Sequence, residues 1–129
     1  MLNLSLKELS QALERKKFTS VELTQFFLDR VKKYNSLLNA FITVDEDKSL
    51  EMAKKSDQLI QSGKKLILTG IPIAQKDIFC ADGWKTTCGS KMLENFISPY
   101  DSTVIQKFNE IGAVNLGKTN MDEFAMGSS

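Results

Sequence analysis

The sequence predicts an α/β fold, with helices at the N-terminal end followed by a βαβ unit. Apolar residues recur every three or four positions through the first third of the chain, which is the period of an amphipathic helix. Two short apolar runs, residues 71–74 and 113–116, have the length of buried strands. A helical pattern over residues 102–111 separates them, so we expect parallel strands joined by a right-handed crossover.

Composition limits the classes of function. The chain has 129 residues, enough for one small domain, and its 17 basic and 16 acidic residues give a net charge of +1. Such a balance creates no field that would attract nucleic acid or anionic lipid. No apolar run approaches the roughly 18 residues of a membrane span, and the two cysteines fit no zinc spacing, so we expect a cytoplasmic protein without a metal site.

The chain contains no histidine. Catalytic triads built on histidine, and the commonest metal sites, are therefore excluded for this chain alone. Acid–base chemistry near pH 7 would fall to a lysine, a carboxylate or a cysteine with an altered proton affinity. Cys80 and Cys88 are expected to be small buried residues and not nucleophiles.

Two helices are predicted from their N-terminal signals. Ser5 and Glu8 form a capping box, stapled by Leu4 and Leu9, and Thr19 with Glu22 repeats the pattern. An apolar stripe of about five turns then follows. The stripe of this second helix comprises Leu23, Phe27, Val31, Tyr34, Leu38 and Phe41, and it is widened by Phe26 and Leu37. The apolar stripe of the first helix comprises Leu6, Leu9 and Leu13.

A third helix is predicted over residues 47–62, with Leu50, Ala53 and Ile60 facing inward and Gly63 just past its end. Because it is more polar, we expect it to form a solvated outer layer. The sequence pattern changes at Lys65. We therefore expect a single incomplete domain that consists of a helical region, 1–64, and a first βαβ portion, 65–129. Parallel sheets rarely stop at two strands, so the chain is interpreted as the front of a larger α/β protein.

The first apolar strand ends on Lys76, beside Asp77. A lysine at the end of a buried strand either extends to water along its own stem or stays inside the protein with an altered proton affinity. The second alternative would make it a base at neutral pH. The residues alone leave both alternatives open.

Residues 112–119 match the phosphate-binding pattern G-x-x-x-x-G-K-[ST]. That pattern requires a strand before the first glycine and a helix opening at the lysine. Here the first glycine follows a predicted helix and the intervening residues resemble a strand. A nucleotide site is therefore disfavoured, and Lys118 is expected to be structural or solvent-facing.

Three blocks of the sequence resemble the amidase signature family. They are residues 70–77 (GIPIAQKD), 86–95 (TTCGSKMLEN) and 117–129 (GKTNMDEFAMGSS). The second and third blocks are most similar to the A subunits of tRNA-dependent amidotransferases. The resemblance covers nearly the whole chain but only about the first quarter of such a protein.

The resemblance implies a large mixed sheet wrapped by helices and a Ser–cis-Ser–Lys triad. Its lysine corresponds to Lys76, whereas both serines belong to a segment that this sequence lacks. The resemblance also places four residues near the substrate, Ala125, Met126, Gly127 and Ser128. The alternative for these four is a glycine-containing turn whose serines cap a following helix.

The function implied is glutamine hydrolysis with release of ammonia, inside a heterotrimer. The B subunit would use ATP and Mg²⁺ to activate a misacylated tRNA, Glu-tRNA or Asp-tRNA, and a small C subunit would brace the pair. The 129-residue chain itself is expected to bind no cofactor and to have no amidase activity. The alternatives are an amidase-signature hydrolase with another amide substrate, and a stand-alone nucleotide- or partner-binding module.

Overall fold

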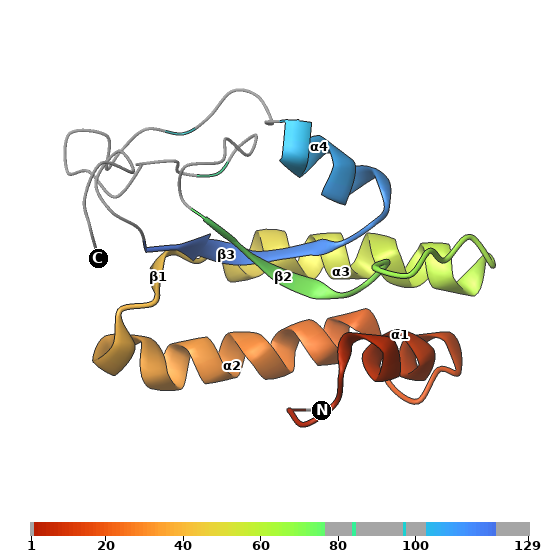
Figure 1. The fold of residues 1–129 in the computed structure, drawn as a ribbon, viewed down its shortest axis with the longest axis horizontal. Coiled ribbons are helices and arrows are strands. Elements are labelled where there is room, and N and C mark those ends of the chain that lie inside the picture. The colour runs from red at the N-terminus through yellow and green to blue at the C-terminus, as the bar shows by residue number, and fades with distance from the viewer. Residues whose placement is uncertain (1, 77–83, 85–96, 98–102, 121–129) are drawn as a thin grey trace.

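A computed structural model describes residues 2–76, 84, 97 and 103–120 (Figure 1). The elements are α1 (Leu6–Glu14), α2 (Ser20–Leu38), β1 (Phe41–Thr43), α3 (Glu46–Gln61), β2 (Pro72–Lys76), α4 (Thr103–Glu110) and β3 (Val114–Thr119). The predicted α/β class is confirmed. No helix among these residues is long and apolar enough to cross a membrane.

The sheet has the strand order β1-β3-β2, so the last strand in sequence lies in the middle. β2 and β3 pair in parallel, as the βαβ prediction requires, and β1 pairs antiparallel with β3. In Figure 1 the sheet lies between α4 on one side and α1 with α2 on the other, while α3 runs alongside the strands. The result is a small mixed sheet.

Both predicted N-terminal caps are present. The Ser5 hydroxyl accepts a hydrogen bond from the Glu8 backbone N–H at 3.2 Å, and a Glu8 carboxylate oxygen accepts one from the Ser5 N–H at 2.7 Å. Thr19 accepts from the Glu22 N–H at 3.1 Å. The core below these helices combines Leu9, Leu13, Leu23 and Ile71, with Phe18, Phe27, Ile60 and Ile73 packed around it.

The predicted helical stripe is too long at its C-terminal end. Asn39 has a left-handed backbone, with φ of 49°, and ends α2. The Asn35 side chain then accepts from the Phe41 N–H at 2.8 Å and donates to the Phe41 carbonyl at 3.0 Å. Phe41 therefore opens strand β1, inside the region expected to be helical. Leu37 and Leu38 do not extend the buried stripe, because they are 81% and 71% exposed; Leu6 is exposed as well.

Helix α3 forms an outer layer, as predicted, with one buried face. Its buried residues are small, namely Ser49, Ala53 and Ser56, and this face lies against β3 and the turn before it. The Ser49 hydroxyl donates to the Asn115 carbonyl and the Ser56 hydroxyl to the Gly112 carbonyl, both at 2.6 Å. Of the three residues expected inward, only Ala53 is fully buried, and Leu50 and Ile60 are half-buried.

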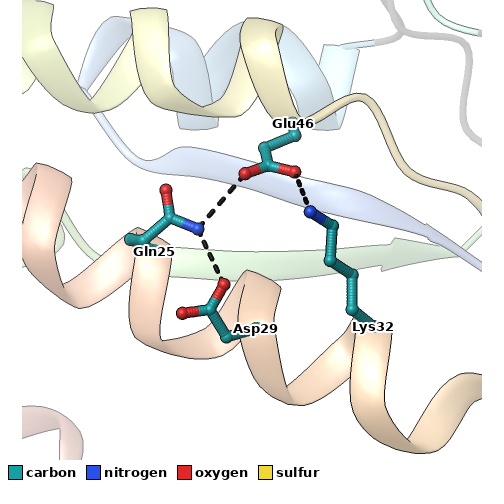
Figure 2. A network of polar contacts seen from close by, with 4 residues as sticks. All are labelled: Gln25, Asp29, Lys32 and Glu46. Carbon is teal, nitrogen blue, oxygen red and sulfur yellow. Dashed lines mark hydrogen bonds and ion pairs between the residues drawn. The ribbon is translucent and has the colours of Figure 1, made fainter.

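Helices α2 and α3 are joined at both ends of their contact. At one end, the Asp57 carboxylate of α3 accepts from the backbone N–H groups of Ser20 at 2.7 Å and Val21 at 3.2 Å. At the other, Figure 2 shows Glu46 of α3 bound to Lys32 at 2.8 Å and to Gln25 at 3.2 Å. Gln25 also donates to Asp29 at 2.8 Å (Figure 2). Together these contacts fix the two helices relative to one another.

Candidate active site

Lys76 is the last residue of β2, the position predicted from the sequence. It lies opposite Thr119 of β3, and Gln75 lies opposite Lys118. Because β2 and β3 are parallel, their carboxyl ends meet at one edge of the sheet, where ligands commonly bind in open α/β sheets. The site therefore begins at this edge.

Of the two alternatives for Lys76, withdrawal into the protein and extension to water, the described part of the chain shows the second, because the side chain is exposed. The lysine that is fully buried is Lys118, at 0% exposure, so the solvent-facing alternative for Lys118 is wrong. The strand pattern predicts where Lys76 lies along the chain. It does not predict how much of the side chain is covered, because that depends on segments distant in sequence.

The start of β2 is held by three hydrogen bonds, one from a side chain and two between backbone groups. Gly70 has φ of +82°, a conformation that favours glycine, and its carbonyl accepts from the Ser20 hydroxyl at 2.8 Å. The Gly70 N–H donates to the Gly112 carbonyl at 2.8 Å, and the Val114 N–H donates to the Ile71 carbonyl at 2.9 Å. The buried end of the strand is thus anchored to α2 and to β3, and the strand delivers Lys76 at the opposite end.

The phosphate-binding pattern does not form a phosphate loop. Gly117, Lys118 and Thr119 belong to strand β3, where the pattern needs the start of a helix. Gly112, with φ of +78°, follows the end of α4. Gly117 is required for a different reason, since a Cβ there would lie 2.8 Å from the Thr43 carbonyl oxygen. The small residue permits β1 to approach β3.

The other predicted site residues lie outside the described residues. They are Ala125, Met126, Gly127 and Ser128, and the same holds for Asp77, Cys80 and Cys88. Within the described ranges, no group of three or more carboxylates or cysteines could hold a metal ion. Of the predicted site, then, the structure places Lys76 alone.

A cavity of about 870 Å³ lies between α3 and α4 and reaches the sheet. Its apolar wall includes Met52, Leu59, Trp84 and Ile105. Gln75 and Asn115 also line it, and they are only 4% and 2% exposed. These two amides were not predicted from the sequence, although each is a polar residue inside an apolar strand pattern, which is the signal that could have identified them.

A protein-family comparison decides the assignment: the family described as Amidase matches residues 22–129. The chain belongs to the amidase family. The match includes β2 with Lys76, β3 and the block that contains residues 125–128.

Curated relatives extend the assignment. This amidase-family chain is 66% identical over 129 residues to the A subunit of glutamyl-tRNA(Gln) amidotransferase from Nitrosomonas eutropha, covering 100% of this chain and 26% of the relative. It is also 66% identical, over 130 residues, to the protein of the same name from Dechloromonas aromatica, covering 100% of this chain and 27% of the relative. The chain therefore spans about a quarter of the length of the curated relatives it matches.

Solved amidase structures share the fold. The peptide amidase from Stenotrophomonas maltophilia superposes with a TM-score of 0.88 at 29% identity, covering 95% of this chain and 26% of that one. An amidase family protein from Bacillus anthracis gives 0.87 at 31% identity, with coverage of 95% and 25%. The arrangement of helices and mixed sheet described above is accordingly the amidase arrangement.

Proposed function

We propose that this chain is the N-terminal part of the glutamine-hydrolysing subunit of a tRNA-dependent amidotransferase. The observation that carries the proposal is its 58–66% identity, over 97% or more of its length, to proteins named as the A subunit of glutamyl-tRNA(Gln) amidotransferase. The solved peptide amidase is much less similar, at 29%. The alternative of an unrelated nucleotide-binding module depended on the phosphate-binding pattern. That support is removed, because the glycine-lysine-threonine run lies in a strand.

In the proposed reaction, a serine hydroxyl encoded beyond this chain adds to the carboxamide carbon of glutamine. Its proton passes through a second serine to Lys76, which acts as the base. Ammonia leaves with a returned proton, and water then hydrolyses the acyl-enzyme to glutamate. Residues 125–128 line the substrate pocket in this proposal.

The exposed position of Lys76 defines what the rest of the protein must add. An amine in water holds its proton at pH 7, so a lysine base requires partial desolvation. The chain covers 26% of its relatives' length, and we propose that the remaining polypeptide closes over the carboxyl edge of β2 and β3.

The partners proposed are a B subunit, which uses ATP and Mg²⁺ to activate Glu-tRNA(Gln), and a small C subunit. Ammonia would pass from the glutamine site to the B subunit. The misacylated tRNA would be contacted mainly by the partner, in keeping with the net charge of +1 on this chain.

A chimera tests the proposal. Residues 1–129 of this chain would be joined to the remainder of the Nitrosomonas eutropha relative, and the product would be expressed with that organism's partner subunits. Lys76→Ala should lower glutamine-dependent ammonia release by about 10²–10⁴-fold, the usual contribution of a general base. Lys54→Ala removes an exposed lysine of α3 and should leave the rate unchanged.

Two outcomes would contradict the proposal. If Lys76→Ala released ammonia within twofold of the parent rate while remaining folded, Lys76 would have no part in the mechanism. If the parent chimera hydrolysed peptide amides but not glutamine, the chain would belong to another amide hydrolase of the same family.

A further inference from the structure

Strand β3 contains one residue more than β2 over the length where the two strands pair. Ile73 lies opposite Asn115 and the next residue, Ala74, lies opposite Gly117, so Leu116 is the extra residue. Such a bulge is rare between parallel strands, and it changes the direction of the side chains beyond it. Bulges are frequent beside active sites, and this one comes just before the candidate site at the end of β2.

The extra residue decides what lies opposite Lys76. Beyond the bulge, Gln75 lies opposite Lys118 and Lys76 lies opposite Thr119. In a continuous register every pair beyond Ile73 would move by one position, and Lys76 would lie opposite Lys118. Opposite side chains in paired strands are neighbours on one face, where two like charges repel. The bulge therefore separates the exposed Lys76 from the fully buried Lys118.

The side chain of Asn115 closes the bulge. Its Oδ1 atom accepts a hydrogen bond at 3.1 Å from the N–H of Gly117, two residues further along the strand. Asparagine commonly bonds to its own backbone in this way where a chain turns. The residue is only 2% exposed, and within the described part of the chain its Nδ2 group has no partner. The amide is therefore used here as an acceptor.

Helix α3 holds the backbone of the same residue. The hydroxyl of Ser49, which is fully buried, donates to the Asn115 carbonyl at 2.6 Å. Ser56 of the same helix donates to the Gly112 carbonyl, also at 2.6 Å, but that carbonyl precedes β3 and the bulge. The two serines thus make equivalent bonds, and only the bond from Ser49 reaches the bulge.

We propose that Asn115 is a positioning residue for the amide hydrolysis proposed above. By holding the bulge of β3, it sets the register that places Lys76 opposite Thr119. The inference rests on the proposed function, in which Lys76 is the base, and the effect of Asn115 passes through the strand register. A misplacement of about 1 Å at a reacting group can cost roughly 10²-fold in rate, so this register should matter for turnover and not for stability alone.

Steady-state kinetics of the chimera tests the inference. Asn115→Leu keeps the approximate size of the side chain and removes the acceptor. It should lower kcat for ammonia release by about 10–100-fold and leave KM within about twofold of the parent value. Asn115→Asp keeps an oxygen at the position of Oδ1 and should restore most of kcat.

The two serines of α3 provide a matched comparison that does not alter β3 itself. Ser49→Ala removes the bond to the bulge and should lower kcat without raising KM. Ser56→Ala removes an equivalent bond elsewhere, so it should lower the melting temperature and leave kcat at the parent value. This pair decides the question even if Asn115→Leu does not fold.

Crystal structures of the parent chimera and of Asn115→Leu follow the register without any need for turnover. Lys76 should lie opposite Thr119 in the parent and be displaced from it in the variant. An unchanged register, or an unchanged kcat, in Asn115→Leu would overturn the inference. Equal losses of kcat in Ser49→Ala and Ser56→Ala would overturn it as well, because stability would then govern the rate.

Failure of the proposed function looks different. If Lys76→Ala kept the parent rate, Lys76 would not be the base, and the inference would fall with the proposed function whatever the register. If Lys76→Ala were inactive while Asn115→Leu kept its kcat, the inference alone would fail.

Discussion

At the residue scale, the contact between Glu46 and Lys32 is the clearest electrostatic interaction in the described part of the chain (Figure 2). The hydrogen bond from Lys32, followed by the one from Gln25, holds the pKa of Glu46 below its usual value. The pKa of Lys32 is raised by the same hydrogen bond and by the charge of Glu46. Both ends are on the surface, so the pair orients the helices and contributes little stability.

The first prediction concerns the titration of Glu46. Because the pKa of Glu46 is lowered in the folded state, its contribution is present above the unfolded value and is lost as the pH falls through the folded pKa. Lys32→Met should raise the pKa of Glu46 toward its ordinary value in a carboxyl-carbon NMR titration. Lys54→Met removes the same charge from an exposed position and should leave this titration unchanged. An equal shift in both variants would contradict the pairing.

A second residue-scale prediction concerns Gly117. A Cβ at this position would lie 2.8 Å from the Thr43 carbonyl oxygen and 2.9 Å from Phe41 Cδ1, both closer than real Cβ contacts allow. Gly117→Ala should therefore push β1 away from β3 and cost about 1–3 kcal/mol, as overpacking usually does. Urea denaturation measures the loss.

The comparison for Gly117 is Gly63→Ala. A Cβ at Gly63 would meet no atom within 4 Å, so this replacement costs only the strain of a positive φ of +75°. Amide exchange should accelerate across residues 41–43 in Gly117→Ala and not in Gly63→Ala. Unchanged exchange in β1 would show that the strands do not approach as closely as described.

At the scale of elements, α3 adds to the N-terminal cap that Thr19 gives to α2. Asp57 accepts two backbone N–H groups at the start of α2, a role usually played by a residue adjacent in sequence. Asp57→Ala should destabilise the chain by about 0.5–2 kcal/mol. Asp57→Asn keeps one acceptor and should lose less.

The control for Asp57 is Glu51→Ala, which removes an exposed carboxylate of the same helix whose ion pair with Lys55 is 3.9 Å long. Thermal melts of Asp57→Ala, Asp57→Asn and Glu51→Ala rank the three variants by their loss of stability. A loss in Glu51→Ala equal to that in Asp57→Ala would mean that net charge matters here, and not the cap.

Much of the element structure was predictable because its determinants are local. Ser5 with Glu8 and Thr19 with Glu22 set helix starts through side chains three residues away, and the apolar runs set β2 and β3. Strand β1 was not predicted, since Phe41 continues the helical period and the chain leaves the helix at Asn39. The places of Ser49 and Ser56 on the inner face of α3 were not predicted, because their partners are carbonyls more than fifty residues away.

The same distinction applies to the candidate site. The position of Lys76 at a strand end follows from residues 71–76 alone. Its exposure, the burial of Lys118 and the two amides in the cavity wall depend on how β2, β3 and α3 come together. Coverage of a side chain is a property of the whole fold, and a sequence pattern of six residues does not contain it.

At the scale of the whole molecule, both outer strands of the described sheet are edges, and several large apolar side chains are exposed, including Ile67 at 71% and Leu66 at 55%. We expect the 129-residue chain alone to release no ammonia from glutamine above background, because the serines of the proposed triad are not encoded in it. The chimera should be active and should melt higher, by roughly 2–8 °C for each kcal/mol that the added contacts supply. Glutaminase activity in the 129-residue chain would require a nucleophile within it and would contradict the assignment of the triad.

The central place of β3 has a consequence for biosynthesis. β1 and β2 flank β3 and do not pair with each other, yet β3 is the last of the three to be made. While a ribosome extends the nascent polypeptide, the two earlier segments have no strand to pair with, and water satisfies their backbone groups until residues 114–119 emerge between them. Helices α2 and α3 also contact each other directly, so this part of the helical layer can form in that interval.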